Sequence, residues 1–461
     1  MPEFVYIIGI LIIFIYWIFS KKIQKDPHII FLSVLIILMT IYALYHLSVH
    51  EITYLLNYSI ILTPMNQFIK VVILLITILI LITSFHFIDK NLFEFCILIL
   101  LTTFGLLALI SINDLVLISL CLELQSLGLY ALIGFLTKSS LSKEATLKYF
   151  IFGSISSIFI GFGISLIYVE FGTTNLNELD LLINDLFINK FVVYGLFFFW
   201  IGYFFKLALV PFHFWIADVY QGAPLIVTFF LATVPKIANV YLVLKLIFLL
   251  NVNFFIYLVL ISIIYGTVMS IYQVKLTRFL GYSSMTHIGF AILGILQCSM
   301  QGEIAGMLYI IGYSFLYLNL FLVILSLRER YSDISMIELV DFSNLIKTNK
   351  IISFMFIITL FSIGGVPPLA GFFFKWYIFN SIITAQNNFL ALCLIVISII
   401  NMIFYIRLAR LIYFNENIYL IIKNFVNIDR GLLVILIYQF FFNTFFLFFH
   451  MGFIEKLFNF I

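Results

Sequence analysis

Five ionisable side chains stand inside long apolar runs of this 461-residue chain, namely Glu123, Lys206, Lys236, Lys245 and Lys375. A charge at the centre of a bilayer costs roughly 2.5–3.5 kcal/mol on insertion scales, so membrane proteins retain such residues chiefly for function. A buried lysine changes its protonation state readily, whereas an arginine stays charged. These residue types in this setting predict a pathway for protons.

Glu123 lies in the segment ISLCLELQSLGLYAL, and Lys206 lies in GYFFKLALVPFHFWIADVYQGAP. An opposite charge within about 4–6 Å stabilises the charged form of both groups. We therefore predict that Glu123 and Lys206 form an ion pair, directly or through water, and that Lys206 releases its proton when the pair separates. The alternatives are a protonated, hydrogen-bonded Glu123 at a helix contact and a Lys206 that snorkels to the interface.

Lys236 has no acidic neighbour in sequence, so we expect it to be neutral at rest, because desolvation disfavours the charged form. The alternative is a contact of Lys236 with backbone carbonyls at a helix break beside Pro235. Lys375 is the third predicted proton carrier, and we expect Lys206, Lys236 and Lys375 to line one polar axis. Lys245 is near a span end, where snorkelling is the favoured interpretation.

Four of the eight prolines stand close to these lysines, namely Pro211, Pro235, Pro367 and Pro368. Proline removes a backbone donor and kinks or breaks a helix. Broken helices at membrane depth are tolerated where they are buried in protein or line a polar cavity. We expect breaks near Pro211 and Pro367.

Three further residues are weaker candidates for proton transfer. His213 and His287 could relay protons near neutral pH, or they could be hydrogen-bonded structural residues. Lys148, in KEATLKYFIFGS, could be a proton entry point or an ordinary basic flank of a span.

The composition is that of a polytopic membrane protein, with 64% hydrophobic and 10% charged residues, where a soluble domain carries about 25% charged residues. The four cysteines fall in apolar runs, and their spacing suits neither a zinc site nor a disulfide framework. No nucleotide-binding or redox motif occurs. We therefore predict no metal site and no cofactor-binding site in this chain.

Runs of about 20 apolar residues predict membrane spans. Fourteen are expected, at about 4–20, 29–46, 70–88, 93–111, 115–136, 149–169, 191–210, 225–249, 254–273, 281–298, 305–326, 351–379, 387–406 and 432–453.

The basic residues give these spans a direction. Of the 24 lysines and arginines, seventeen lie in loops after odd-numbered spans, and three lie in the loops after even spans or in the tail (Lys70, Lys190 and Lys456). Since basic loops stay on the cytoplasmic or matrix side, both termini should face outward and the loop 327–350 inward. The start of the chain lacks the features of a signal or transit peptide. Together with the abundance of Phe, Ile, Tyr and Asn, this favours synthesis inside an organelle.

The segments around the charged residues resemble a known family. KLALVPFHFWIADVYQGAP followed by FLATVPKIA, together with LELQSL, KYFIFGSISS, GYSSMTHIGF and GGVPPLAGFFFKWY, closely resembles the subunit 2 family of respiratory complex I, the N-type antiporter-like subunits. These motifs run from about residue 120 to 377. One departure is Ala217, where the family pattern often has proline.

The resemblance implies an all-α fold of about fourteen transmembrane helices with two inverted five-helix repeats, each with one broken helix. The chain would then divide into four parts: helices 1–3 (1–92), a first repeat (93–250), a second repeat (251–412) and helix 14 (413–461). The family's glutamate, its paired lysine, its central lysine and its distal lysine match Glu123, Lys206, Lys236 and Lys375. The family's matrix-side lysine matches Lys148.

The resemblance also implies a proton-translocating membrane-arm subunit of NADH:ubiquinone oxidoreductase in the mitochondrial inner membrane. NADH, FMN, iron–sulfur clusters and ubiquinone would bind to other subunits. The expected partners are neighbouring antiporter-like subunits and lipids, with no nucleic acid. The alternatives are a subunit of a related multi-subunit cation/proton antiporter, a structural membrane-arm subunit without pumping, and a plastid-type complex.

Overall fold

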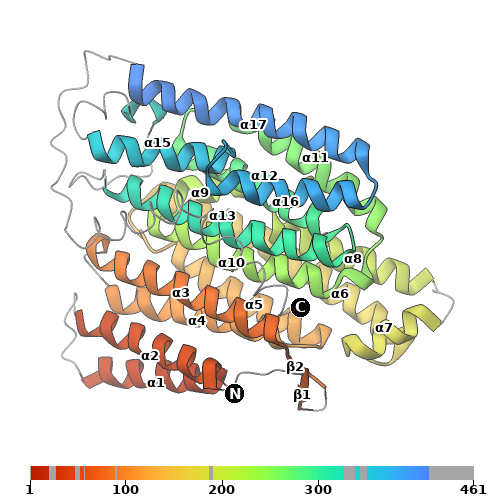
Figure 1. Ribbon diagram of the computed structural model, residues 1–461. Coiled ribbons are helices and arrows are strands. Elements are labelled where there is room, and N and C mark those ends of the chain that lie inside the picture. The colour runs from red at the N-terminus through yellow and green to blue at the C-terminus, as the bar shows by residue number, and fades with distance from the viewer. Residues whose placement is uncertain are drawn as a thin grey trace. The chain divides into compact units, whose positions relative to one another are not determined.

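The computed structural model describes residues 2–19, 27–46, 52–56, 58–88, 91–185, 190–326, 338–342 and 350–414 (Figure 1). Within these residues the chain is almost entirely helical, and eleven helices are long and apolar enough to cross a membrane. The prediction of an all-α, polytopic membrane protein is therefore confirmed. The expected span at 432–453 and most of the loop 327–350 lie outside the described residues.

The chain divides into two compact units. The first unit contains the residues up to Leu207 together with Ile237–Leu250, and the second contains Ala208–Lys236 and the residues from Asn251 onward. The division into four parts at residues 92, 250 and 412 stays a prediction.

The first unit begins with four helices, packed side by side, and one hairpin (Figure 1). Its elements are α1 (Pro2–Phe19), α2 (Pro27–His46), β1 (Thr53–Leu55), β2 (Ile60–Leu62), α3 (Pro64–Phe87), α4 (Leu92–Ser111), α5 (Leu115–Ile133), α6 (Ser140–Phe171), α7 (Leu176–Asp185), α8 (Lys190–Leu207), the second part of α10 (Leu225–Lys245) and the 3₁₀ turn η1 (Ile247–Leu249). The antiparallel β1–β2 hairpin and the short helix α7 were not expected from the sequence.

Local sequence fixes where these helices begin and end. Thr63 accepts a hydrogen bond from Asn66 N at the start of α3, and Pro64 occupies the first helical position, where its missing N–H is harmless. Asp114 caps α5 by accepting from Val116 N at 2.9 Å. Gly172, at φ +69°, ends α6 in the left-handed conformation that glycine favours.

Small residues bring α6 and α8 together. A Cβ on Gly163 would lie 2.5 Å from Phe199 N, and one on Gly202 would lie 2.5 Å from Ser156 O. Only glycine allows the two backbones to approach this closely, which is the usual way that membrane helices gain packing energy. This contact fixes the orientation of α8, whose last turn carries Lys206.

The second unit is built around α12 and α13, which pack on each other and on α16. Its elements are α9 (Ile216–Gly222), the first part of α10, α11 (Val252–Ile271), α12 (Leu276–Ile295), α13 (Met300–Ser326), the 3₁₀ turn η3 (Leu339–Phe342), α15 (Lys350–Gly364), α16 (Ala370–Thr384) and α17 (Asn388–Phe414). Almost the whole of α12 is buried, which is unusual for a helix with several hydroxyl side chains.

Both expected helix breaks are present. After α8 ends at Leu207, Ala208 adopts φ +57° and the next helix begins only at Ile216. After α15 ends at Gly364, Gly365 adopts φ +90° and α16 begins at Ala370. In contrast, α10 continues through Pro235, so the helix break on which the alternative interpretation of Lys236 depended is absent.

Candidate functional site

Glu123 and Lys206 both belong to the first unit. Glu123 lies in the middle of α5, and Lys206 is half-buried in the last turn of α8. The Lys206 ammonium lies within electrostatic range of the Glu123 carboxylate. Among the described residues, ion pairs shorter than 4 Å join Lys70 to Glu3, Lys148 to Glu144 and Arg278 to Asp218. Glu123 and Lys206 therefore interact at longer range, and bridging by water stays a prediction.

The interpretation of Glu123 as a buried carboxylate is wrong for the chain taken alone. Glu123 is exposed on α5, on the same face as Val116, Leu120 and Leu127, which are also exposed. An ionisable group in a membrane span almost always faces protein or a water-filled cavity. We therefore expect the face of α5 that carries Glu123 to contact protein or a water-filled cavity in the membrane.

Lys236 lies in the second unit and is 8% exposed. Its Nζ has no hydrogen-bond partner in the described part of the chain, so the expected alternative of a carbonyl contact is not seen. The ring of Tyr220 faces it, with its centroid 5.4 Å from Nζ. A cation over an aromatic face is stabilised by only about 0.5–2 kcal/mol, well short of what a carboxylate partner supplies.

His287 is the centre of a hydroxyl-rich cluster on α12. Its Nδ1 lies 2.7 Å from the Tyr309 hydroxyl and its Nε2 lies 3.2 Å from the Tyr405 hydroxyl. The imidazole is close enough to both Lys375 and Lys236 for their charges to act on it. The structure thus places His287, a weaker candidate from the sequence, within electrostatic range of the two lysines of this unit.

Serine and tyrosine hydroxyls extend this cluster toward Tyr220. Ser284 Oγ lies 3.5 Å from the Tyr220 hydroxyl, and Ser283 Oγ bonds the Tyr317 hydroxyl. Neutral hydroxyls both donate and accept, so they can pass a proton along a chain of hydrogen bonds. Sequence reasoning missed these residues, although the run of hydroxyls in GYSSMTHIGF was a signal.

Lys375 is 4% exposed and bonds the carbonyl oxygen of Gly364 at 2.6 Å. That carbonyl is at the end of α15, where the broken helix leaves its last backbone acceptors unpaired. Gly365 allows this contact, because a Cβ there would lie 3.0 Å from Lys375 Nζ. The helix break therefore supplies the hydrogen-bond acceptor of Lys375, and it lies beside the lysine as the neighbouring prolines predicted.

The other two candidates from the sequence, Lys148 and His213, have no hydrogen bond to the cluster around His287 among the contacts described above. Lys148, half-buried on α6, forms an ion pair with Glu144 at 2.5 Å. His213 is buried in the first break, with its ring centroid 4.3 Å from that of Tyr265. Arg278 bonds Asp218 at 2.5 Å, which ties α12 to α9. Among the described residues no group of His, Cys, Asp and Glu could hold a metal ion.

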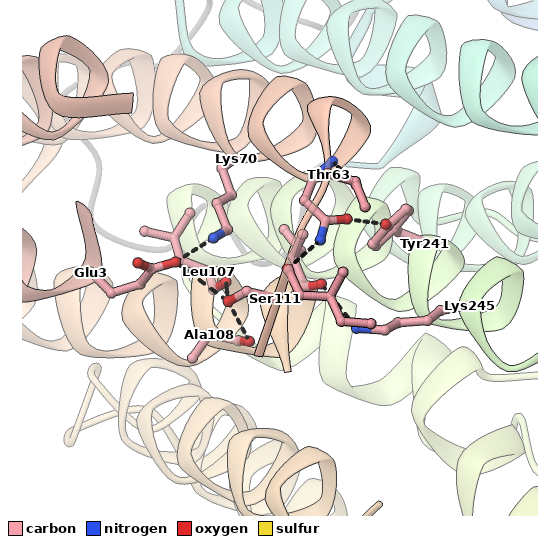
Figure 2. Close-up of polar contacts among 11 residues, drawn as sticks. Glu3, Thr63, Lys70, Leu107, Ala108, Ser111, Tyr241 and Lys245 are labelled. Atoms are coloured by element: carbon pink, nitrogen blue, oxygen red, sulfur yellow. Dashed lines mark hydrogen bonds and ion pairs between the residues drawn. The ribbon is translucent and has the colours of Figure 1, made fainter. Parts of the chain in front are cut away.

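Two lysines differ from expectation (Figure 2). Lys70, assigned to a loop from the sequence, is buried on α3 and forms an ion pair with Glu3. Lys245 does not extend freely from the end of α10, because its ammonium bonds the carbonyls of Ile110 and Ile112. Cys298 also differs, since it is exposed between α12 and α13.

The bundle of apolar helices, the two helix breaks and the lysines buried beside them define an antiporter-like membrane protein. The chain belongs to the family described as NADH:quinone oxidoreductase/Mrp antiporter, TM, whose model matches residues 112–401.

Curated relatives extend this match along the chain. The NADH-quinone oxidoreductase subunit N of Pelagibacter ubique is 36% identical over 332 residues, which cover 70% of each chain. The NADH-ubiquinone oxidoreductase chain 2 of Marchantia polymorpha is 33% identical over 436 residues, which cover 90% of this chain and 88% of the relative.

Solved structures share the fold. A chain of respiratory complex I from Thermus thermophilus aligns with a TM-score of 0.78 and 24% identity, covering 90% of this chain and 91% of that one. A chain of the Mrp complex from Dietzia aligns with a TM-score of 0.77 and 18% identity, covering 90% and 80%. At these identities the likeness concerns the fold alone.

Proposed function

We propose that this chain is a proton-translocating membrane-arm subunit of NADH:ubiquinone oxidoreductase. Relatives that match 70–90% of the chain bear the names of subunits of that enzyme. The observation that carries the proposal is Lys236, a buried lysine without a carboxylate or carbonyl partner among the described residues, within electrostatic range of His287. Because the Lys236 amine has no hydrogen bond to break in the described part of the chain, it can bind or release a proton with little rearrangement of its neighbours.

The proposed transfer moves protons and no other atoms. A proton on the Lys206 ammonium is retained while the Glu123 carboxylate is charged, and is released when that charge is withdrawn. Lys236 accepts a proton as neutral amine and becomes an ammonium. It then donates that proton through His287 and the neighbouring hydroxyls to Lys375, which returns Lys236 to its neutral form. The connection from Lys206 to Lys236 is part of the proposal.

Quinone reduction in other subunits supplies the energy in this scheme. In this scheme NADH, FMN, iron–sulfur clusters and ubiquinone bind there, and the role of this chain is proton transfer. Moving one charge against 100 mV requires about 2.3 kcal/mol. Neighbouring antiporter-like subunits cover the exposed face of α5, so that Glu123 faces protein instead of lipid.

We assign the chain to the mitochondrial inner membrane, with both termini on the intermembrane-space side and synthesis inside the organelle. Support comes from the distribution of basic residues and from the named chain 2 relative of Marchantia polymorpha. A single cysteine in place of Lys143, an exposed residue in the first turn of α6, should react with an impermeant thiol reagent only from the matrix side. One in place of Lys190, at the start of α8, should react only from the opposite side.

The central test is Glu123→Gln in the assembled complex, reconstituted in sealed vesicles. We expect proton output and coupled NADH:quinone turnover to fall roughly tenfold or more, because loss of about 1.4 kcal/mol of electrostatic stabilisation corresponds to that factor. Glu178→Gln, on the exposed side of α7, is the matched control and should leave both unchanged.

The same experiment separates the alternatives. Wild-type turnover and proton output in Glu123→Gln would support a structural subunit without pumping and would overturn the proposal. Purification of the chain without flavin and iron–sulfur subunits would favour a stand-alone cation/proton antiporter.

A further inference from the structure

A second group of buried charges lies in the first unit, away from Glu123 and Lys206 in sequence and on different helices (Figure 2). Glu3 is in the first turn of α1 and Lys70 is in the second turn of α3, while Ser111 and Lys245 are the last residues of α4 and α10. Two helices therefore begin and two end at this cluster. It consequently lies toward one face of the membrane.

The carboxylate of Glu3 is only partly satisfied. Its Oε1 accepts a hydrogen bond from the Lys70 ammonium and a second, at 3.4 Å, from the Ser111 hydroxyl. Its Oε2 is buried and has no hydrogen-bond partner among the described residues. The Lys70 side chain is 1% exposed and that of Glu3 is 14% exposed, so Glu3 is the member of the pair whose side chain lies nearer the surface.

A second cation is held beside this pair. The Lys245 ammonium bonds the carbonyls of Ile110 and Ile112, on either side of Ser111, at the end of α4 where the helix dipole favours positive charge. It is close enough to Lys70 for the two charges to interact. Two cations thus accompany one carboxylate, and the charge of the cluster depends on which groups hold protons.

We propose that Glu3 and Lys70 form a second proton-binding site, which releases protons at the face of the membrane where α1 and α3 begin. This inference rests on the proposed function. A proton that arrives binds Glu3 Oε2 and gives a neutral carboxylic acid beside a charged Lys70. Loss of one proton to solvent restores the ion pair. Positive charge on Lys245, close to Lys70, favours this release.

The rival interpretation is that Glu3 and Lys70 form a structural ion pair, which holds α1 against α3 and α4 and binds no transported proton. Removing one member of the pair harms the protein under either interpretation, because it leaves an uncompensated buried charge. Removing both members together distinguishes them. Replacing a buried ion pair by neutral groups of similar volume is often harmless to stability.

The test is the double variant Glu3→Gln/Lys70→Met in the assembled complex, reconstituted in sealed vesicles. We expect the complex to assemble as the wild type does and the number of protons released per NADH to fall. An unchanged proton yield per NADH would overturn the proposal. Glu178→Gln serves as the control for loss of a carboxylate in the same unit.

Labelling of the wild-type complex tests the same site without any substitution. Carbodiimides modify protonated carboxyl groups in apolar surroundings, so Glu3 should be labelled more during turnover than at rest. Equal labelling in both states, or none, would contradict the proposal even if the double variant failed to assemble. Normal pumping in the double variant while Glu123→Gln pumps poorly would reject only this inference. Normal pumping in both would reject the proposed function itself.

Discussion

The lysines of the two units are stabilised in different ways. In the first unit, Lys70 bonds a carboxylate, Lys245 bonds two carbonyls and Lys206 lies within range of Glu123. In the second unit, Lys375 donates a hydrogen bond to one carbonyl, and Lys236 lies near the ring of Tyr220. The first unit therefore places a carboxylate near two of these three lysines, Lys70 and Lys206. In the described part of the second unit, neither of these two lysines bonds a carboxylate. We infer that protonation changes most readily in the second unit.

The largest effect that this comparison predicts is at Lys236. Lys236→Arg should lower proton output roughly tenfold or more while the complex still assembles, because a guanidinium stays charged and cannot alternate between two protonation states. Proton output and NADH:quinone turnover in vesicles measure this effect. Lys190→Arg, on an exposed residue, is the control. Normal pumping in Lys236→Arg would show that a permanent charge suffices there, and the contrast between the units would fail.

Gly365→Ala should have an intermediate effect. Its φ of +90° costs a residue with a Cβ about 1 kcal/mol or more, and the new methyl group would press on the Lys375 side chain. We expect a several-fold loss of proton output. Gly172→Ala is a matched control, because it has φ +69° but open space around the new Cβ. Equal effects of the two substitutions on output would show that backbone strain, and not the position of Lys375, is responsible.

The smallest effect should follow Lys245→Arg. An arginine retains the charge and can still donate to the carbonyls of Ile110 and Ile112, so assembly and proton output should change less than twofold. Lys245→Met should be worse, since it leaves those carbonyls without their cation. If Lys245→Arg proved as damaging as Lys236→Arg, then Lys245 would have to change protonation too, and the first unit would resemble the second.

The sequence predicted what depends on local chemistry. Apolar runs gave the helices, and Pro211 and Pro367 gave the breaks, because the constraint on proline acts within one turn. Apart from the approach of Glu123 and Lys206, it did not predict the contacts between distant segments described above. Lys70 was assigned to a loop because nothing near it in sequence shows that Glu3, 67 residues away, lies beside it. The exposure of Glu123 was missed for the same reason, since the face of α5 that packs inward depends on the whole bundle.

The position of Glu123 has a consequence for biogenesis. A newly inserted copy of the chain presents this side chain, in an otherwise apolar stripe of α5, to acyl chains until a partner covers it. An unpartnered copy therefore has a higher free energy in the bilayer than an assembled one. The residue that we propose as the trigger of proton transfer in the mature complex thus also favours association of the chain with the partner that covers this face of α5.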